Sequence, residues 1–255
     1  MWLADINIQN RYETAVNEAL SDYHKFKTFK NNPNYNCIVG MSQQWQAPFF
    51  YDFIKEKNKN IFNKINLFIK NDLIGSPEIW NSKDGIYISP NTLRYIKTLV
   101  DLENAFGNLD NFVIAELGIG YGGLSFIINT NNKLKDYVLC DLPQVQKLAQ
   151  KYLSIFDIQT TDDKNKYNEF DLFISEFCLS EFSDEQIDIF YEELVLKSNR
   201  IYLTMNLHDE IRKQRFLNKI KKDFNINVFD EYPVTHWPNY IITGNKKMRF
   251  ATQEV

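Results

Sequence analysis

Four of the nine glycines fall within six residues, in the segment FVIAELGIGYGG at residues 112–123. An apolar run precedes this cluster and the segment SFIINT follows it, so we expect a strand, a tight turn and a helix in that order. Glycines at such a turn let the backbone approach a ligand where any side chain would clash. The cluster therefore predicts a site at which the main chain itself contacts a bound molecule.

The glycine segment satisfies two nucleotide-binding patterns. Residues 118–123 fit the dinucleotide pattern G-x-G-x-x-G, and residues 116–122 fit the acidic-x-G-x-G-x-G pattern of enzymes that use S-adenosylmethionine (SAM). Glu116 would attract the ammonium group of SAM and repel a pyrophosphate, which favours SAM. Asp141 ends the next predicted strand, where a carboxylate can accept hydrogen bonds from the ribose hydroxyls of either ligand. The predicted cofactor-binding residues are Glu116, Gly118, Gly120, Tyr121, Gly122, Asp141 and Leu142.

Histidine is the side chain best suited to remove a proton from an alcohol, because its pKa lies near the working pH. The chain contains three. His208 follows a predicted strand at residues 200–206, at the edge where open α/β sheets bind ligands. His236 lies between the last two strand-like segments, in a loop that opens onto the same edge if the first of these strands runs parallel to the main sheet. We predict a catalytic or substrate-binding role for both, and a solvated position for His24.

A third catalytic candidate, Glu176, ends the predicted strand at residues 171–176. Its carboxylate has three roles open to it: contact with the amino group of SAM, proton removal, or a divalent metal site shared with His208 and Asp209. The chain has no compact spacing of metal ligands, so the metal site is not favoured. Glu181 is suited either to the site or to stabilising the N-terminus of the helix that follows it.

The elements that must position these residues change type along the chain. Apolar residues recur at helical spacing through the first hundred or so residues, with an irregular loop at 31–48. From Asn111 short apolar runs alternate with helices, which predicts a parallel α/β sheet. The predicted strands of this part are residues 112–117, 137–141, 171–176 and 200–206.

Two further strand-like segments, residues 225–232 and 240–245, follow with only a short loop between them. They predict an antiparallel hairpin at the end of the sheet. An all-parallel dinucleotide-binding domain would not need such a hairpin, whereas the sheet of SAM-dependent methyltransferases ends in one. The hairpin is therefore a second feature that favours SAM.

Composition narrows the function classes further. The 255 residues carry 29 Lys and Arg against 33 Asp and Glu, a net charge of −4, which disfavours nucleic-acid binding. Hydrophobic residues make up 44% of the chain, and the mean hydropathy is −0.40, as in a soluble globular protein. No apolar run is long enough for a membrane span and no leader peptide is evident, so we expect a cytoplasmic protein. The three cysteines are expected to be reduced packing residues, and the sequence leaves homo-oligomerisation open.

Four segments, ELGIGYGGLSFIIN, YVLCDLPQVQKLAQKYL, FDLFISEFCLSEFS and RIYLTMN, resemble at these spacings the sugar O-methyltransferase family of class I SAM-dependent enzymes. The similar stretch runs from about residue 84 to 206, and its more specific signs are D-L-P after the second strand and L-S-E after the third. The resemblance implies a Rossmann-like fold and SAM as methyl donor. It also implies a sugar hydroxyl as acceptor, often on a nucleotide sugar for bacterial surface polysaccharide, such as a capsule or lipopolysaccharide heptose.

The resemblance also implies that the stretch opening the helix near Pro90 packs close to the cofactor. Tyr87 and Arg94 would then reach the methionine carboxylate or an acceptor phosphate. Trp45 and Trp237 are suited to sugar recognition, because aromatic rings stack on sugars. Together these four residues form the predicted substrate set.

We therefore predict an α/β, Rossmann-like fold with a seven-stranded, mostly parallel sheet, an antiparallel C-terminal hairpin and a helical N-terminal cap. Residues 1–109 would form the cap and acceptor region, and residues 110–255 the SAM-binding domain. The predicted activity is SAM-dependent O-methylation of a small sugar, with neither nucleic acid nor membrane insertion involved. Two alternatives stay open: an NAD(P)-dependent oxidoreductase, for which a Tyr-x-x-x-Lys pair is expected after a later strand but does not occur there, and a SAM-binding partner protein without catalysis.

Overall fold

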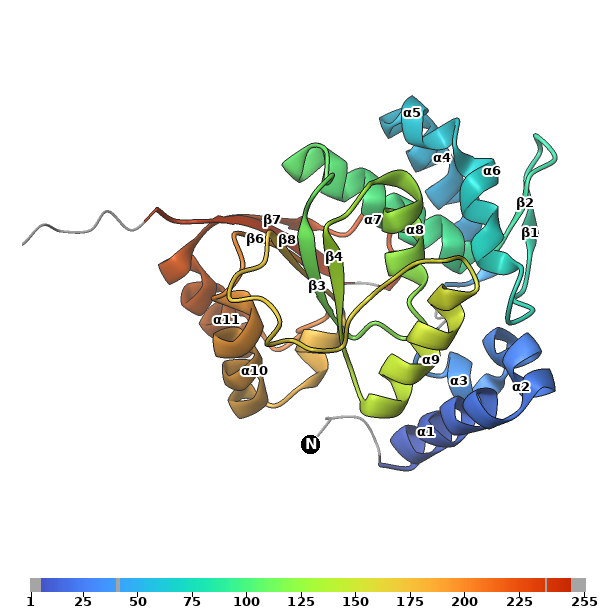
Figure 1. Cartoon of the computed structure of the whole chain (residues 1–255). Helices are drawn as coiled ribbons and strands as arrows, with labels where there is room; N and C mark the ends of the chain where they lie inside the picture. The colour runs from blue at the N-terminus through green and yellow to red at the C-terminus, as the bar shows by residue number, and fades with distance from the viewer. Residues whose placement is uncertain (1–5, 40–41, 237, 249–255) are drawn as a thin grey trace, which may run out of the picture.

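A computed structural model describes residues 6–39, 42–236 and 238–248, and its centre is a six-stranded sheet in the order β4-β3-β5-β6-β8-β7 (Figure 1). Within this sheet, the first four strands in chain order, β3 to β6, are apolar runs buried on both faces, as strands of a parallel sheet are. The strand bounds are β3 Val113–Leu117, β4 Asp136–Cys140, β5 Leu172–Glu176, β6 Arg200–Met205, β7 Phe224–Asp230 and β8 Tyr240–Lys246.

The strand directions confirm a mostly parallel sheet with an antiparallel C-terminal hairpin. β4, β3, β5 and β6 pair in parallel, and β8 runs antiparallel to both β6 and β7. β7 therefore has the same direction as β6, so the β7–β8 loop opens at the carboxyl edge of the parallel strands. This direction brings His236, in that loop, to the same edge as His208, which follows β6.

The prediction of seven strands was wrong: the sheet of the described residues has six. Beyond β4, where a seventh would pair, the chain makes only an isolated parallel bridge between Val138 and Thr161. The segment around this bridge, QTTDDKNKYNE at residues 159–169, has no apolar run. A strand there would have no hydrophobic face to bury, so pairing ends after one bridge.

Two hydrophobic clusters cover the two faces of the sheet, because successive strand residues point to opposite sides. Ile114, Leu139 and Ile174 belong to one cluster, with α7 (Pro90–Phe106), α8 (Gly123–Asn131) and α9 (Pro143–Ser154). Strand neighbours of these residues, such as Ala115 and Phe173, belong to the other, with α10 (Asp184–Phe190), the π-helical turn Tyr191–Val195 and α11 (Glu210–Asp223). Figure 1 shows α10 and α11 together on one side of the sheet.

The N-terminal part is helical, as its periodicity predicts, and its apolar residues join the cluster of α7, α8 and α9. α1 packs on α9, and α4 packs on α7. The helices of this part are α1 Ile6–Ser21, α2 Tyr23–Thr28, α3 Pro33–Asn36, α4 Ala47–Lys57, α5 Lys59–Phe62 and α6 Ile65–Phe68, with short 3-10 turns at Phe29–Asn31, Gln44–Gln46 and Ile69–Asp72.

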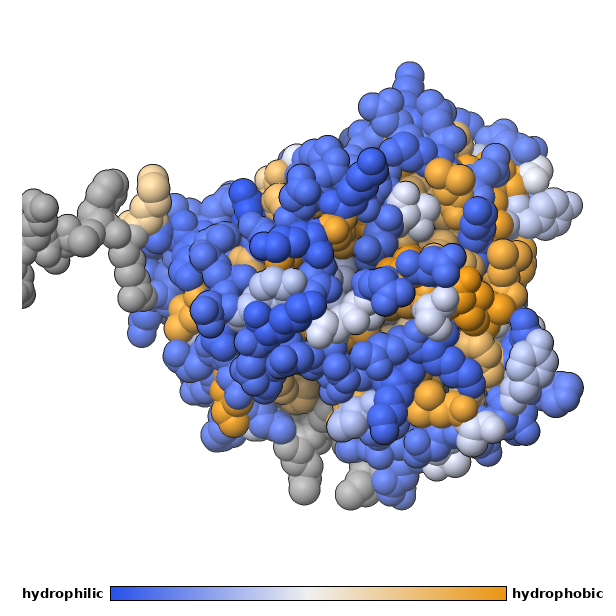
Figure 2. All heavy atoms as spheres, viewed as in Figure 1, coloured by the Kyte–Doolittle hydropathy of each residue, from blue (hydrophilic) through white to orange (hydrophobic). Residues whose placement is uncertain are grey.

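A two-stranded antiparallel sheet, β1 (Trp80–Asn81) with β2 (Tyr87–Ile88), interrupts the helical part and was not predicted. Two-residue strands are too short to show alternation. After them Ser89 caps α7 by accepting a hydrogen bond from the backbone N–H of Thr92, with Pro90 in the first turn as expected. No helix of the described residues combines the length and apolar character needed to cross a membrane, and hydrophilic side chains predominate on the face seen in Figure 2.

Candidate functional site

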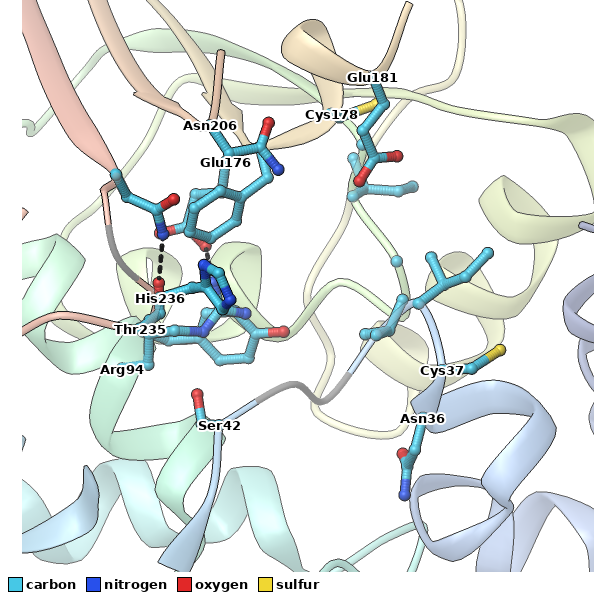
Figure 3. Close-up of a pocket in the computed structure, with 18 of the residues that line it drawn as sticks. Asn36, Cys37, Ser42, Arg94, Glu176, Cys178, Glu181, Asn206, Thr235 and His236 are labelled. Carbon is cyan, nitrogen blue, oxygen red and sulfur yellow. Dashed lines mark hydrogen bonds and ion pairs between the residues drawn. The ribbon is translucent and has the colours of Figure 1, made fainter. Parts of the chain in front are cut away.

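A cavity of about 670 Å³ lies at the carboxyl edge of the sheet. Its walls combine the ends of β3, β4, β5 and β6 with the β7–β8 loop, the start of α7 and N-terminal residues from 36–39 and 42–45. Figure 3 shows Glu176, Asn206 and His236 on one side of the cavity and Cys178 and Glu181 on the other. Segments that are far apart in the sequence thus enclose one space.

The glycine turn forms part of the cavity wall with bare backbone. Gly118 has a φ of 86°, and a Cβ added there would lie 2.3 Å from the Cβ of Cys178. A Cβ on Gly120 would lie 3.1 Å from Cγ1 of Val39, and its φ is 53°. A larger residue at either position would crowd Cys178 or Val39 and strain the turn, so the glycines let these side chains pack closely against the backbone of the cavity wall.

Glu116 lines the cavity beneath the turn and is only 3% exposed. The hydroxyl of Tyr137 donates a hydrogen bond of 2.6 Å to Oε2 of this carboxyl. Burial raises the pKa of Glu116 to about 8, since a charged carboxylate loses its hydration there. A cationic group in the cavity would offset that penalty and favour the ionised form.

Asp141, at the end of β4, faces the other side of the glycine turn. It accepts hydrogen bonds from the backbone N–H of Leu142 at 2.7 Å and from that of Gly120 at 3.3 Å. Burial raises the pKa of Asp141 to about 7 against the opposing effect of these hydrogen bonds. Leu142 is therefore linked to the site through its backbone, while its side chain packs against the hydrophobic cluster of α9.

Arg94 and Glu176 form an ion pair inside the cavity. Nη1 of Arg94 lies 3.0 Å from Oε2 of Glu176, and the two side chains are 12% and 8% exposed. Thr98 donates a hydrogen bond of 2.5 Å to the other oxygen of Glu176. Because both oxygens of Glu176 are engaged, this carboxylate is poorly placed to remove a proton. Nε of Arg94 is buried without a hydrogen-bond partner within the described residues.

Both candidate bases line the cavity: the ring centroids of His208 and His236 lie 6.4 Å apart. The loop with His236 is tied to the N-terminal segment, because Nε2 of Gln46 donates hydrogen bonds to the carbonyls of Val234 and Thr235 at 3.0 and 2.7 Å. Asp209 does not join the histidines. It caps α11 by accepting a hydrogen bond from the backbone N–H of Arg212 at 2.7 Å.

Glu181, whose role the sequence left open, points its carboxyl into the cavity (Figure 3). Burial and the nearby charge of Asp141 raise the pKa of Glu181 to about 7. Sequence reasoning missed several other lining residues. Their only signal was a position shortly after a strand end or inside a loop, as for Cys178, Asn206, Thr235, Asn239 and Ser42.

Several predicted residues lie outside the cavity or outside the described residues. The hydroxyl of Tyr121 accepts a hydrogen bond from Asn71 within the core, and Gly122 packs against Leu153, so neither lines the cavity. Tyr87 is 61% exposed on β2 and also lies outside it. Trp45 does line the cavity and is 60% exposed. The remaining substrate candidate, Trp237, lies outside the described residues.

Among the described residues, no group of three or more His, Cys, Asp or Glu side chains is arranged to hold a metal ion. Cys140 and Cys178 are buried, and all three cysteines are free.

Comparison with family models finds no match for this chain, and comparison with curated proteins finds none either. Solved structures do resemble it. Magnesium protoporphyrin IX methyltransferase from Synechocystis, solved with bound SAM, is 15% identical, with 79% of this chain and 97% of that chain covered and a TM-score of 0.47.

A precorrin-6y methyltransferase from Geobacter metallireducens is 15% identical, with 68% and 97% of the two chains covered and a TM-score of 0.45. An rRNA methylase from Streptococcus thermophilus is 14% identical, with 55% and 90% covered and a TM-score of 0.42. Identities this low transfer neither a substrate nor a site residue. The α/β, Rossmann-like fold of this chain follows from its own strand order and directions.

Proposed function

We propose that this protein is a SAM-dependent O-methyltransferase that acts on a hydroxyl of a sugar. One observation carries the proposal: a single cavity joins a glycine turn and two acidic strand ends, which suit SAM, with two histidines, which suit proton removal. A nucleotide-activated sugar is the narrower form of the proposal that the sequence resemblance implies. When bound, SAM supplies a methyl group on a positively charged sulfur that leaves as a neutral thioether.

The residues of the cavity fit the methionine end of SAM. Glu116 and Arg94 both line the cavity, where the carboxyl of Glu116 suits the ammonium group and the guanidinium of Arg94 suits the carboxylate. Arg94 stays oriented because Glu176 holds its Nη1. In this arrangement Glu176 acts on the ligand through Arg94 and does not touch the reacting atoms.

The nucleoside end is suited to Asp141 and the bare backbone at Gly118 and Gly120. A carboxylate at Asp141 accepts hydrogen bonds from vicinal ribose hydroxyls. A dinucleotide would place its pyrophosphate near Glu116, Asp141 and the glycine turn, where burial already raises the pKa of both carboxyls because negative charge is disfavoured there. These surroundings favour the cationic SAM over NAD(P) and count against the oxidoreductase alternative.

His208 and His236 are the groups available to take the proton of the acceptor hydroxyl. As the oxygen–carbon bond forms and the sulfur–carbon bond breaks, the proton passes to the nitrogen of one imidazole. The tie from Gln46 to the β7–β8 loop keeps His236 at the cavity. The exposed ring of Trp45 at the cavity mouth supports a sugar acceptor, since aromatic rings stack on sugar faces.

Calorimetry and a turnover assay test the proposal. We expect SAM and S-adenosylhomocysteine to bind with one site per chain, and NAD and NADP not to bind. Incubation with SAM and a panel of free and nucleotide-linked sugars should then produce S-adenosylhomocysteine and a methylated sugar. Absence of binding by both nucleosides would refute the proposal, and binding without turnover on any acceptor would favour the non-catalytic SAM-binding protein.

A further inference from the structure

Asn239 carries a buried hydrogen-bond acceptor that nothing in the described protein uses. The residue follows the β7–β8 loop, lines the cavity and is 3% exposed. Its Oδ1 is buried and has no hydrogen-bond partner. An unpaired buried carbonyl lowers the stability of the folded protein, and a ligand that donates a hydrogen bond to it would remove this cost.

The orientation of the Asn239 amide is fixed by its neighbours. Nδ2 donates hydrogen bonds of 3.0 Å to Oε2 of Glu231 and 3.0 Å to Oγ1 of Thr235. Thr235 in turn donates from its backbone N–H and its hydroxyl to the same carboxylate oxygen, at 2.9 and 2.6 Å. A carboxylate only accepts hydrogen bonds, so the amide cannot flip, and Oδ1 must be the atom left over.

A backbone hydrogen bond links Asn239 to His236, one of the two candidate bases. The backbone N–H of Asn239 donates a hydrogen bond of 3.1 Å to the carbonyl of His236, and both side chains line the cavity. Asn239 and His236 are thus tied to each other on one loop that lines the cavity. This loop is suited to the methyl acceptor, whereas the glycine turn is suited to the methyl donor.

The charges of the cavity restrict what the acceptor can carry. Arg94 is the only Lys or Arg among the described lining residues, and it is paired with Glu176. The other acidic lining groups are the carboxyls of Glu116, Asp141 and Glu181, and burial raises the pKa of each because the cavity disfavours negative charge. A phosphate would bring further negative charge into this space, whereas a hydroxyl or an ammonium group would not.

We propose that Asn239 is an acceptor-binding residue whose Oδ1 takes a hydrogen bond from a hydroxyl or an amine of the sugar, and that the cavity selects an acceptor without phosphate. This inference rests on the proposed function and narrows it, because it replaces the nucleotide-activated sugar with an uncharged or amino sugar. A hydroxyl and an amine can both donate this hydrogen bond, and a series of substrates distinguishes between them.

The first test uses the wild-type protein and one sugar in several charge states. The probes are methyl α-D-glucopyranoside, D-glucosamine, glucose 1-phosphate and UDP-glucose, with the matching mannose series, each titrated into the complex with S-adenosylhomocysteine. We expect the uncharged or the amino members to bind at least about 10-fold more tightly than the phosphorylated ones. Tighter binding of the uncharged member identifies a hydroxyl donor, and tighter binding of glucosamine identifies an amine.

Preference for UDP-glucose, GDP-mannose or a sugar phosphate would overturn the proposal, and so would failure of every uncharged and amino member to bind. Binding of S-adenosylhomocysteine itself is the separate readout for the proposed function. A protein that binds it but prefers phosphorylated sugars keeps that function and loses this inference.

The second test is Asn239→Leu, with Tyr240→Phe as the matched control. Tyr240 is the next residue and has a buried, unpartnered hydroxyl, but it does not line the cavity. With the best probe of the series, Asn239→Leu should raise the acceptor KM about 10-fold or more, with kcat within about 3-fold and unchanged affinity for S-adenosylhomocysteine. Tyr240→Phe should change none of these values. An unchanged KM in a folded Asn239→Leu protein, or equal losses in both variants, would contradict the role of Asn239.

Discussion

At the scale of single residues, the two histidines are the groups on which proton removal depends. We predict that His208→Ala or His236→Ala lowers kcat by about 10²-fold, the effect typical of losing a positioned base. The affinity for S-adenosylhomocysteine should stay near that of the wild type, because neither ring is needed to bind the nucleoside. Steady-state kinetics and calorimetry on each variant measure both quantities. Normal turnover in both variants would assign the proton to another group.

The buried carboxyl of Glu116, again a single residue, should make the stability of the protein depend on pH. Its pKa in the folded protein is about 8, above that of an exposed carboxyl, so the folded state binds more protons than the unfolded state between roughly pH 4 and 8. The contribution of Glu116 to the free energy of unfolding therefore falls as pH rises through this window. Glu116→Gln should remove this loss and give a higher Tm than the wild type at pH 8, with little difference near pH 4.

The same carboxyl should couple SAM binding to proton release. A cationic ligand stabilises the ionised form of Glu116, so we expect the affinity for SAM to rise between about pH 6 and 8 and to be much weaker in Glu116→Gln. Calorimetry in buffers of different ionisation enthalpy counts the released protons. A pH-independent affinity, or a Glu116→Gln variant that binds SAM like the wild type, would show that Glu116 does not contact the ligand.

At the scale of elements, the turn between β3 and α8 is the part whose shape the function needs most. Gly118→Ala should weaken the binding of S-adenosylhomocysteine by at least about 10-fold, because the new Cβ would overlap the Cβ of Cys178. Gly85→Ala is the matched control: Gly85 also has a positive φ, of 79°, but a Cβ there meets nothing within 4 Å. Both variants carry the backbone strain of a left-handed residue, about 1–2 kcal/mol, and only the first should lose binding. Equal binding in the two would remove the glycine turn from the site.

At the scale of the whole molecule, Lys30 joins the N-terminal helices to the sheet domain. Its ammonium group is buried, donates a hydrogen bond of 3.3 Å to the hydroxyl of Tyr152 and lies 4.2 Å from the ring centroid of Tyr121. Burial lowers the pKa of Lys30 to about 7. Since the unfolded chain holds this proton up to about pH 10, the unfolded state binds more protons between pH 7 and 10, and stability should rise with pH there.

We predict that Lys30→Met flattens this rise in the free energy of unfolding between pH 7 and 10. Lys30 also donates a hydrogen bond to the carbonyl of Asn71. That carbonyl accepts a second hydrogen bond, of 2.7 Å, from the hydroxyl of Tyr152, so it stays paired in the variant. Urea denaturation at several pH values measures the slope. Lys27→Met, at a neighbouring lysine that is partly exposed, is the control and should keep the wild-type slope. The same slope in both variants would mean that Lys30 is not buried as an ionisable group.

The sequence by itself determined the four parallel strands and the C-terminal hairpin. Apolar runs such as FVIAEL and RIYLTMN can only be buried on both faces, and a short loop between two strand-like segments forces them antiparallel. The capping box of Ser183 and Gln186 that begins α10 likewise depends on near neighbours in the chain. The prediction of a seventh strand was wrong because it came from the resemblance and not from an apolar run. The polar segment at 159–169 offers no hydrophobic face to bury.

Tertiary structure alone decided which of the predicted residues share a cavity. Tyr121, inside the glycine motif, turns into the core, where Asn71 and Tyr152 contact it, while Arg94, more than eighty residues before Glu176, pairs with it. The orientation of the Asn239 amide depends on Glu231 and Thr235, and no local pattern reveals it. Local sequence determines periodicity and turns, because these depend on near neighbours in the chain. Ion pairs, orphaned polar atoms and the charge of a cavity depend on contacts between distant segments, which exist only once the chain has folded.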